Sequence, residues 1–336
     1  MRLVRLARPK APLPTVVAAA AATLAVAGLT AGCSGGSGSA SASGTITVAA
    51  IKGVDTAPLY AGDKAGGTFA QAGLNVKIEN YTSVKAEITA LRQGKVDVAA
   101  GDYVDFLYAQ SAHHGMEIVA DGYHAGPGVM EVLTKPHSGI TSPSQLVGRK
   151  VGTPAPQELP IQESGNPFSI ETLAAQSVLS DDNIDPTSVR WTPMPAAHLV
   201  RALATGKVSA IVVQEPYVYQ AESELGAVEV LDACSGSTAD LPLSGYFATK
   251  DFAKENAPLL QTFQTALEKA QANAIEPGPV RTVLASEPGM AKSASLMTLG
   301  SYPTTLNPAS PQRVAQLMFI FEIMDTDLNV KPLIFH

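Results

Sequence analysis

The sequence predicts an α/β fold of two doubly wound lobes joined by two hinge strands. The first observation behind this prediction is a repeated unit, because ALRQGKVDVAAGDY ends at Tyr103 and ALATGKVSAIVVQEPY ends at Tyr217. The copies lie 112 residues apart, counted from Leu91 to Leu203, whereas solenoid repeats have periods of about 20–50 residues. The second observation is the dense alternation of strand-like and helix-like segments around each copy, which is typical of parallel sheets with right-handed crossovers. We therefore expect one copy of the unit in each lobe. Each copy ends in an acidic residue and a tyrosine, Asp102-Tyr103 in the first copy and Glu215-Pro216-Tyr217 in the second. We expect these two acidic-Tyr ends to face each other.

The first lobe is expected to start with three strands and two helices. A helix should begin just before Pro58, because proline suits the first helical turn and Thr56 offers a hydroxyl cap. Apolar residues at helical spacing predict a second helix that stops near Gly94. The expected strands are residues 45–51, 74–78 and 96–100, and the expected helices are residues 57–60 and 84–91.

Two extended apolar segments, residues 129–134 and 243–249, are interpreted as hinges. The stretch between them predicts a self-contained β-α-β-α-β lobe, and the stretch after them is helical. The elements of that lobe are residues 150–153, 167–179, 189–191, 195–203 and 208–213, and the later helices are residues 252–274 and 311–324. Lobe 1 then consists of residues 45–135 and 245–336, and lobe 2, inserted into it, of residues 136–244.

The first 32 residues predict a secretory signal. Arg2, Arg5, Arg8 and Lys10 form a basic start, and residues 16–29 form an apolar run too short to span a membrane. The small residues before Cys33 resemble the lipobox of bacterial lipoproteins, which implies cleavage before Cys33 and its lipidation. Thr30 departs from the usual Leu of that pattern, and ordinary secretory cleavage nearby is the alternative. Residues 33–44, rich in Ser, Gly and Ala, predict a flexible tether to the membrane.

Charge and cysteine content exclude several classes of protein. Without residues 1–32 the chain keeps 19 basic and 30 acidic residues, a net charge of −11 with His neutral. Nucleic acid is therefore not an expected partner, because phosphate binding needs a basic face. If Cys33 is lipidated, Cys234 has no partner for a disulfide, and a cysteine-type structural zinc site is excluded. Cys234 is interpreted as a small buried hydrophobe, with a reactive thiol as the alternative.

Four segments carry a family resemblance when they are taken in order: VAAIKGVDTAPLYAGDKAGGTFAQAGLNVKI, ALRQGKVDVAAGDYVDFLYAQ, SPSQLVGRKVG and ATGKVSAIVVQEPY. Together they resemble the substrate-binding lipoproteins of ABC importers for nitrate, sulfonates, taurine and thiamine pyrimidine precursors, over most of residues 45–332. The resemblance implies the type II periplasmic-binding-protein fold and a monomer that closes around a small solute. It also implies an ABC permease as partner, and a location on the outer face of the cytoplasmic membrane through the lipid anchor. No cofactor is expected.

The solute is expected beyond the carboxyl ends of the strands, where ligands bind in open α/β sheets. Closure of the lobes around it would be a hinge motion. Neither a catalytic residue nor a metal ligand is expected. The expected ligand-binding residues are Lys52, Gly53, Tyr60, Asp102, Tyr103, Tyr123, Thr153, Asn166, Ser169, Glu215, Tyr217 and Tyr246.

Each chemical role in this set has a structural alternative. Asp102 and Glu215 contact the ligand or form a helix cap or hinge salt bridge. Tyr103 and Tyr217 stack on a solute or form a core edge, and Lys52 binds an anion or is solvated. Acceptors and aromatic rings favour a nitrogen-bearing solute such as a pyrimidine or an amine. Backbone N–H groups at residues 166–169 leave an oxyanion open as the alternative.

Enzymes and a sensor are the alternative functions. Related folds include pyrimidine synthases with a Cys-rich motif and cytosolic chorismate-type dehydratases, but this chain has no Cys cluster and carries an export signal. G-x-S-x-G, H-E-x-x-H and P-loop motifs do not occur in it. His113, His114 and His124 suggest metal binding or, as the preferred interpretation, a solvated turn. Gene neighbours would distinguish an importer from a tethered solute sensor.

Overall fold

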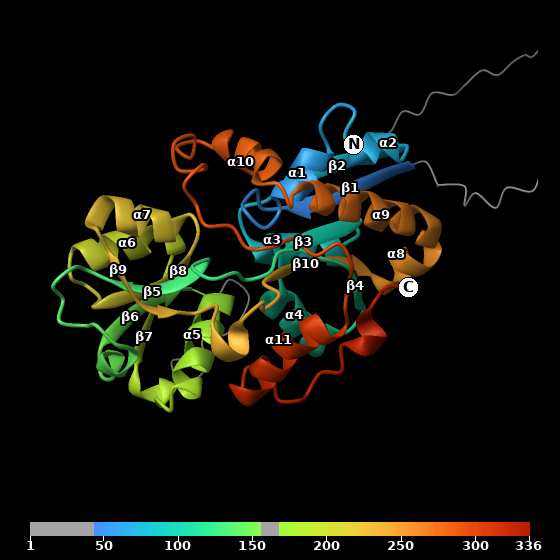
Figure 1. Ribbon diagram of the computed structural model, residues 1–336. Coiled ribbons are helices and arrows are strands. Elements are labelled where there is room, and N and C mark those ends of the chain that lie inside the picture. Colours follow the sequence, from blue (N-terminus) through green and yellow to red (C-terminus); the bar gives the residue numbers. More distant parts are fainter. Residues whose placement is uncertain (1–43, 156–167) are drawn as a thin grey trace, which may run out of the picture. The chain divides into compact units, whose positions relative to one another are not determined.

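The computed structural model describes residues 44–155 and 168–336 (Figure 1). The strands are β1 (Gly44–Ala50), β2 (Leu74–Asn80), β3 (Val98–Asp102), β4 (Met116–Asp121), β5 (Met130–Thr134), β6 (Lys150–Pro154), β7 (Arg190–Met194), β8 (Ala210–Gln214), β9 (Val228–Asp232) and β10 (Ser244–Thr249). The α-helices are α1 (Ala57–Gly62), α2 (Thr68–Gln71), α3 (Val84–Arg92), α4 (Tyr103–His113), α5 (Ile170–Asp181), α6 (Ala196–Ala204), α7 (Tyr217–Leu225), α8 (Lys250–Glu255), α9 (Ala257–Asn273), α10 (Pro277–Ala285) and α11 (Ala309–Ile320). Short 3₁₀ helices are η1 (Pro143–Leu146), η2 (Pro186–Ser188), η3 (Gly236–Thr238) and η4 (Lys331–Leu333).

The expected signal segment, Cys33 and nearly all of the tether lie outside the described residues. Within residues 44–155 and 168–336, no helix has the length and apolar character needed to cross a bilayer.

Two five-stranded sheets with the same plan form the two lobes. The first sheet has the order β2-β1-β3-β10-β4 and the second has the order β7-β6-β8-β5-β9. In each sheet four strands run in one direction, and β10 or β5, fourth in the order, runs antiparallel to both neighbours. The expected purely parallel sheets are therefore mixed, because the antiparallel strand enters its sheet directly from the other lobe. The bilobed α/β fold itself is confirmed.

The structure corrects the position of the first hinge. Residues 130–134 were expected in the first lobe, but β5 pairs with β8 and β9 in the second sheet. Likewise β10 is a full member of the first sheet. Because a strand buried on both faces is a continuous apolar run, the sequence pattern alone does not distinguish it from a hinge.

The chain crosses between the lobes at residues 122–129 and 233–243, and the two crossings form a short antiparallel ribbon. The Ala125 N–H donates to the Leu241 carbonyl at 2.8 Å, and the Leu243 N–H donates to the Tyr123 carbonyl at 2.8 Å. Inside the ribbon the His124 ring is buried, with Asp121 3.0 Å from one nitrogen and Asp240 3.1 Å from the other. Burial lowers the pKa of His124, but hydrogen bonds and charges from Asp121 and Asp240 outweigh burial and raise it. The solvated-turn interpretation is therefore wrong for His124.

The repeated unit is a helix end that passes into a strand, and its geometry is the same in both lobes. After α3, the Gly94 N–H donates to the Leu91 carbonyl at 3.0 Å and the Lys95 N–H donates to the Ala90 carbonyl at 2.9 Å. After α6, Gly206 and Lys207 make the same two bonds at 3.1 and 2.9 Å, to Leu203 and Ala202. This is the Schellman motif, which needs a left-handed residue. Both glycines supply it, with φ values of +64° and +73°.

We predict that Gly94→Ala and Gly206→Ala each lower the free energy of unfolding by about 1 kcal/mol, because a Cβ disfavours the left-handed conformation. Urea denaturation measures the effect. The matched control is Gly278→Ala in α10, where no atom would meet the added Cβ and φ is not positive. A loss at Gly278 as large as at Gly94 would contradict the motif-based explanation.

Helices cover both faces of the first sheet (Figure 1). On one face Tyr246 of β10 and Phe69 of α2 pack against Phe263 of α9. On the other face Phe247 of β10 stacks on Phe106 of α4, with ring centroids 4.0 Å apart. Consecutive residues of β10 thus serve opposite layers, as the alternation of a strand requires.

The loop after β1 is fixed by Thr56, although not as the sequence analysis expected. The Thr56 side chain does not cap α1. Its hydroxyl donates to the Ile51 carbonyl at 2.7 Å and accepts from the Gly53 N–H at 3.1 Å. These bonds hold residues 51–56 in a turn at the carboxyl end of β1.

Candidate functional site

A cavity of about 420 Å³ lies at the carboxyl ends of the parallel strands and is lined from both lobes. The first lobe supplies the loop after β1, the end of β3 and the start of α4. The second lobe supplies the start of α5, the end of β8 and the start of α7, while the crossings add Tyr123 and Leu243. Ligand pockets typically have volumes of about 300–1,000 Å³, so the cavity suits a small molecule.

Seven of the twelve expected residues line this cavity: Lys52, Gly53, Asp102, Tyr123, Ser169, Glu215 and Tyr217. The structure thus brings together the two acidic-Tyr ends of the repeated units, through Asp102 in one lobe and Glu215 and Tyr217 in the other. Asn166 lies outside the described residues. The remaining four are not among the lining residues and are Tyr60, Tyr103, Thr153 and Tyr246.

Tyr103 and Tyr246 are core residues. Tyr103 is fully buried, its ring packs edge-on against Phe247, and its hydroxyl donates to Asp121 at 3.0 Å. The core-edge alternative therefore describes Tyr103. Tyr246 points into the layer of Phe263, because its position on β10 selects the α9 face of the sheet.

Tyr60 and Thr153 face other neighbours. The Tyr60 hydroxyl donates to the Asn80 side chain at 2.5 Å, next to the edge strand β2. Thr153 is fully buried, and its hydroxyl pairs with that of Thr172 behind the cavity wall. Both residues are near the expected strand ends, but their side chains have hydrogen-bond partners outside the lining.

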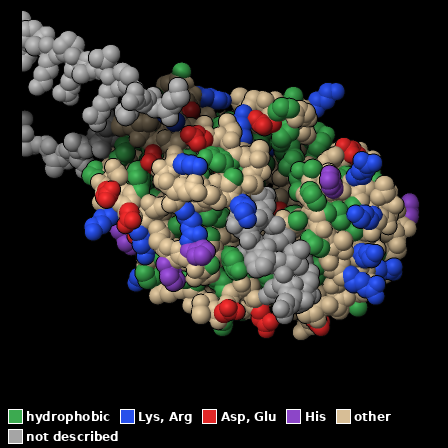
Figure 2. All heavy atoms as spheres, turned by 180° about the vertical axis from the view of Figure 1, so that it is seen from behind, with side chains coloured by type: hydrophobic (Ala, Val, Ile, Leu, Met, Phe, Trp, Pro, Cys, Tyr) green, Lys and Arg blue, Asp and Glu red, His purple; other side chains and the backbone are tan. Residues whose placement is uncertain are grey.

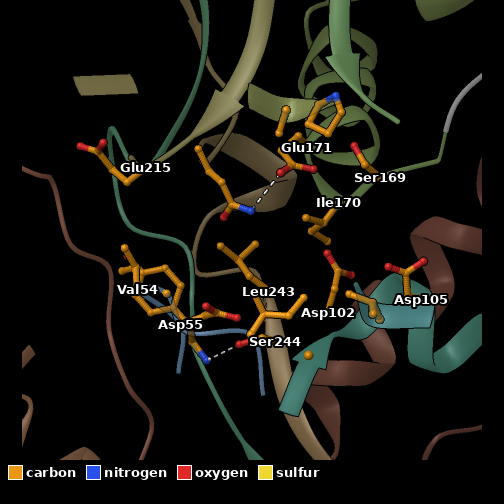
Figure 3. A pocket seen from close by; sticks show the side chains of 18 of the residues that line it. Val54, Asp55, Asp102, Asp105, Ser169, Ile170, Glu171, Glu215, Leu243 and Ser244 are labelled. Carbon is orange, nitrogen blue, oxygen red and sulfur yellow. Dashed lines mark hydrogen bonds between the residues drawn. The ribbon is translucent and has the colours of Figure 1, made fainter. Parts of the chain in front are cut away.

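The cavity is strongly acidic. Six carboxyl residues line it, whereas Lys52 is the one basic residue among its described lining residues. Lys52 Nζ is 2.6 Å from the Glu287 carboxylate and 3.0 Å from the Ser286 hydroxyl, so its charge already has a counterion. The carboxyl residues are Asp55, Glu87, Asp102, Asp105, Glu171 and Glu215. Figure 3 shows Asp102 of the first lobe and Glu171 of the second on two sides of the same space, with Glu215 at its other end.

Acidic side chains already serve the helix N-termini at this cavity. Asp102 caps α4 and accepts from the Val104 N–H at 2.6 Å. Glu215 precedes α7 and accepts from the Tyr219 N–H at 3.1 Å. Ser169 caps α5, with Glu171 in the first turn of that helix. The helix-cap alternative thus describes Asp102, and one N–H group at the start of each of α4, α5 and α7 is bonded to Asp102, Ser169 or Glu215.

Burial and mutual repulsion raise the pKa values of the cavity carboxyls. Burial raises the pKa of Asp55 to about 6, and burial together with Asp55 and Asp105 raises that of Glu87 to about 9. For Asp102 the pKa rises well above the usual range, through burial first and then the charges of Asp105 and Glu171. Burial also raises the pKa of Glu171. Because Lys52 is the one basic residue in the described lining, protons rather than basic side chains offset part of the negative charge, and Glu87 is protonated at neutral pH.

Asp55, Glu87, Asp105 and Glu171 were missed by the sequence analysis. A signal did exist for Glu87, because it falls inside the apolar stripe of α3 that contains Val84, Ile88 and Leu91. A carboxyl group in such a stripe is buried when the helix docks. Asp105 and Glu171 sit in first helical turns, where acidic residues are common for reasons of the helix dipole alone.

Glu215 also joins the second lobe to a segment that follows α10. One carboxyl oxygen accepts from the Thr298 N–H at 2.9 Å, and the other from the Tyr219 N–H. We predict that Glu215→Ala lowers the free energy of unfolding by about 2 kcal/mol, because two backbone N–H groups in part-buried hydrogen bonds lose a charged acceptor. Urea denaturation tests this, with Glu224→Ala on the exposed face of α7 as the control, expected within about 0.5 kcal/mol of wild type. Equal losses of unfolding free energy in the two variants would show that the two hydrogen bonds of Glu215 do not stabilise the protein.

Cys234 is not among the lining residues of the cavity. Cys234 is buried, and burial raises the pKa of its thiol to about 12. In residues 44–155 and 168–336, no group of three His, Cys, Asp or Glu side chains could hold a metal ion.

Comparisons with known proteins agree with the fold. The family described as NMT1/THI5 like matches residues 54–278, and no curated protein matches the sequence. The periplasmic aliphatic sulphonate-binding protein SsuA of Escherichia coli is similar over 87% of this chain and 97% of its own, with 16% identity and a TM-score of 0.67. The periplasmic nitrate-binding protein NrtA of Synechocystis PCC 6803 is similar over 86% of this chain and 84% of its own, with 14% identity and a TM-score of 0.65.

An enzyme has a similar fold. The desulfurization enzyme DSZB is similar over 86% of this chain and 96% of its own, with 14% identity and a TM-score of 0.64. At these identities the likenesses show the fold, which is that of periplasmic binding proteins.

Proposed function

We propose that this chain, which belongs to the NMT1/THI5-like family, is an extracytoplasmic solute-binding lipoprotein that delivers a small molecule to an ABC importer permease. The observation that carries the proposal is the cavity, because it is lined by both lobes and borders the ribbon that joins them. A solute that contacts both walls stabilises the closed arrangement through contacts that one lobe alone cannot make. SsuA and NrtA, which have similar folds, are named as sulphonate- and nitrate-binding proteins.

Lining chemistry supports binding rather than covalent catalysis. A nucleophilic enzyme needs a hydroxyl or thiol beside a base. The serine hydroxyls of the lining have structural roles here: Ser169 accepts from the Thr172 N–H as the cap of α5 and hydrogen-bonds Glu171, and Ser244 accepts from the Tyr123 N–H. We therefore place solute binding before an enzymatic role like that of DSZB.

Two solute classes agree with the family resemblance, nitrate- or sulfonate-like anions and pyrimidine- or amine-like nitrogen compounds. A thermal-shift screen of nitrate, taurine, alkanesulfonates, aminopyrimidines and polyamines tests the proposal. A solute at about 100 times its dissociation constant adds about 2.7 kcal/mol to the folded state, so a true ligand gives a clear shift. The absence of a shift with every class would contradict the proposed function.

Membrane attachment is a separate part of the proposal and has its own test. Lipid on Cys33 would anchor the protein outside the cytoplasmic membrane, with the tether allowing the lobes to reach the permease. Labelling cells with a fatty-acid probe is expected to mark the wild-type protein and not Cys33→Ala, which we expect in the culture fluid or periplasm. Equal membrane retention of the two proteins would show that Cys33 is not the anchor.

Permease and ATPase genes beside this gene would favour the importer over a tethered sensor. Solute uptake by cells that lack the protein separates the two functions directly. An importer component is required for uptake, whereas a sensor changes gene expression and leaves uptake by an induced permease intact.

A further inference from the structure

The solute class can be narrowed from the cavity itself, and this inference rests on the proposed function. We propose that the solute is a small organic cation, whose charged nitrogen lies between Asp102 of the first lobe and Glu171 of the second. The proposal sets this chain apart from the anion-binding proteins that its fold resembles.

The described lining of the cavity contains many more acidic than basic residues. Carboxyl groups outnumber basic groups six to one among the described lining residues, and the single Lys52 is paired with Glu287. Figure 2 shows Lys and Arg side chains on the face in view, but Lys52 is the one Lys or Arg among the described lining residues. An anion in the cavity would meet repulsion without an unpaired lysine or arginine from the described lining to offset it.

Carboxyl groups lie at several of the helix N-termini that open onto the cavity. Oxyanions are commonly held at helix N-termini, and the first or second residue of each of five helices, α3 to α7, lines this cavity. Asp102 caps α4, Glu171 lies in the first turn of α5, and Glu215 bonds to the first turn of α7, whereas α6 has no acidic residue in its first turn. At the starts of α4, α5 and α7 an oxyanion would have to displace or face these carboxyl groups, whereas a cation would be attracted to them.

The surroundings of Glu87 favour a cationic solute independently of the number of acidic residues in the lining. Glu87 lines the cavity, its side chain is fully buried, and apart from a backbone interaction with Ile51 that lowers its pKa, its carboxyl oxygens have no hydrogen-bond partner within the described residues. A buried carboxyl without such a partner is costly. A cationic donor in the cavity would lower that cost, because its field reaches the whole carboxyl cluster.

Binding of a cation would also be coupled to closure of the two lobes. Asp102 and Glu171 come from opposite lobes, and the charge of Glu171 raises the pKa of Asp102. Like charges on facing walls oppose closure in the empty cavity, and a cation between them converts the repulsion into attraction on both sides. Apolar lining residues such as Phe168, Leu243 and Tyr217 would cover the carbon skeleton of an organic cation.

Thermal shift with the wild-type protein tests the charge of the solute. The probes, each at about 10 mM, are the cations agmatine, 1,4-diaminobutane and choline, the anions nitrate and ethanesulfonate, and neutral 1,4-butanediol. We expect a shift from at least one cation and none from the others. Shifts from nitrate or ethanesulfonate alone would overturn the inference and leave the proposed function intact. No shift with any probe would count against both.

Charge-removing variants test the position of the cation. Asp102→Asn keeps a good helix cap, and Glu171→Gln keeps an amide oxygen that can accept from Gln214. Each is expected to weaken binding of the shifting cation at least tenfold, while Asp251→Asn, exposed on α8 and outside the cavity, leaves it unchanged. Because lost repulsion should also stabilise the empty protein at pH 8, a variant with weaker binding and a lower melting temperature would contradict the proposal. Unchanged affinity in both variants would do so as well.

Discussion

Replacing Glu87 by Gln is expected to raise the free energy of unfolding at pH 8 by about 4 kcal/mol. Burial first, and then the charges of Asp55 and Asp105, raise the pKa of Glu87 to about 9 from a usual value of 4.5. The folded protein therefore holds a proton that the unfolded chain releases above pH 4.5. Stability is fully present below that pH and falls by about 1.4 kcal/mol per pH unit until the pH passes 9. Gln has the shape of the protonated side chain and removes this loss.

The dependence of the Glu87→Gln effect on pH distinguishes a change in ionisation from a change in packing. At pH 5 wild type and Glu87→Gln should differ by less than about 1 kcal/mol, because little proton release separates folded and unfolded states there. Urea denaturation at pH 5 and 8 measures both values. An equal effect at the two pH values would mean that the substitution changes packing and not ionisation.

A second large effect is expected at Phe247, where truncation to Ala should lower the free energy of unfolding by about 4 kcal/mol. The ring is 2% exposed, and its centroid lies 4.0 Å from that of Phe106 and 5.5 Å from that of Tyr103. Its loss leaves a void between β10 and α4, in the strand through which the chain re-enters the first lobe. The stacked ring pairs contribute beyond the buried area.

The matched control for this variant is Phe319→Ala in α11, where the side chain is 44% exposed. We expect that control to lose less than about 1 kcal/mol, because a partly exposed ring leaves no closed void. Chemical denaturation of both variants with a common m-value gives the comparison. A loss at Phe247 that does not exceed the loss at Phe319 would contradict the packing described here.

Much of the fold followed from local sequence patterns. Gly94 and Gly206 mark the same helix end in both lobes, and their positive φ values explain why glycine recurs at that point. In the second lobe the order β6, α5, β7, α6 and β8 was predicted, whereas α7 and β9 were not. The sequence did not predict that residues 130–134 belong to the second sheet. They pair with residues about 80 positions later in the chain, and the hydrophobic period within a short segment does not indicate its pairing partner.

The site was predicted less completely than the fold. Asp102 and Glu215 were found because both follow a strand at equivalent places in the repeated unit. Glu171 was missed because it meets Asp102 only through the approach of two lobes. Tyr246 was placed wrongly, since the choice between two faces of β10 depends on which helix packs there. Tertiary contacts, rather than residue type, decided each of these cases.

A crystal structure of the complex would show whether a solute is held between the two lobes. The crystals should contain the solute that gives the largest thermal shift. We expect that solute in the cavity of about 420 Å³, in contact with Asp102 from the first lobe and Glu171 from the second. Contacts from one lobe alone, or a solute bound outside this cavity, would show that the solute is not held between the lobes as proposed.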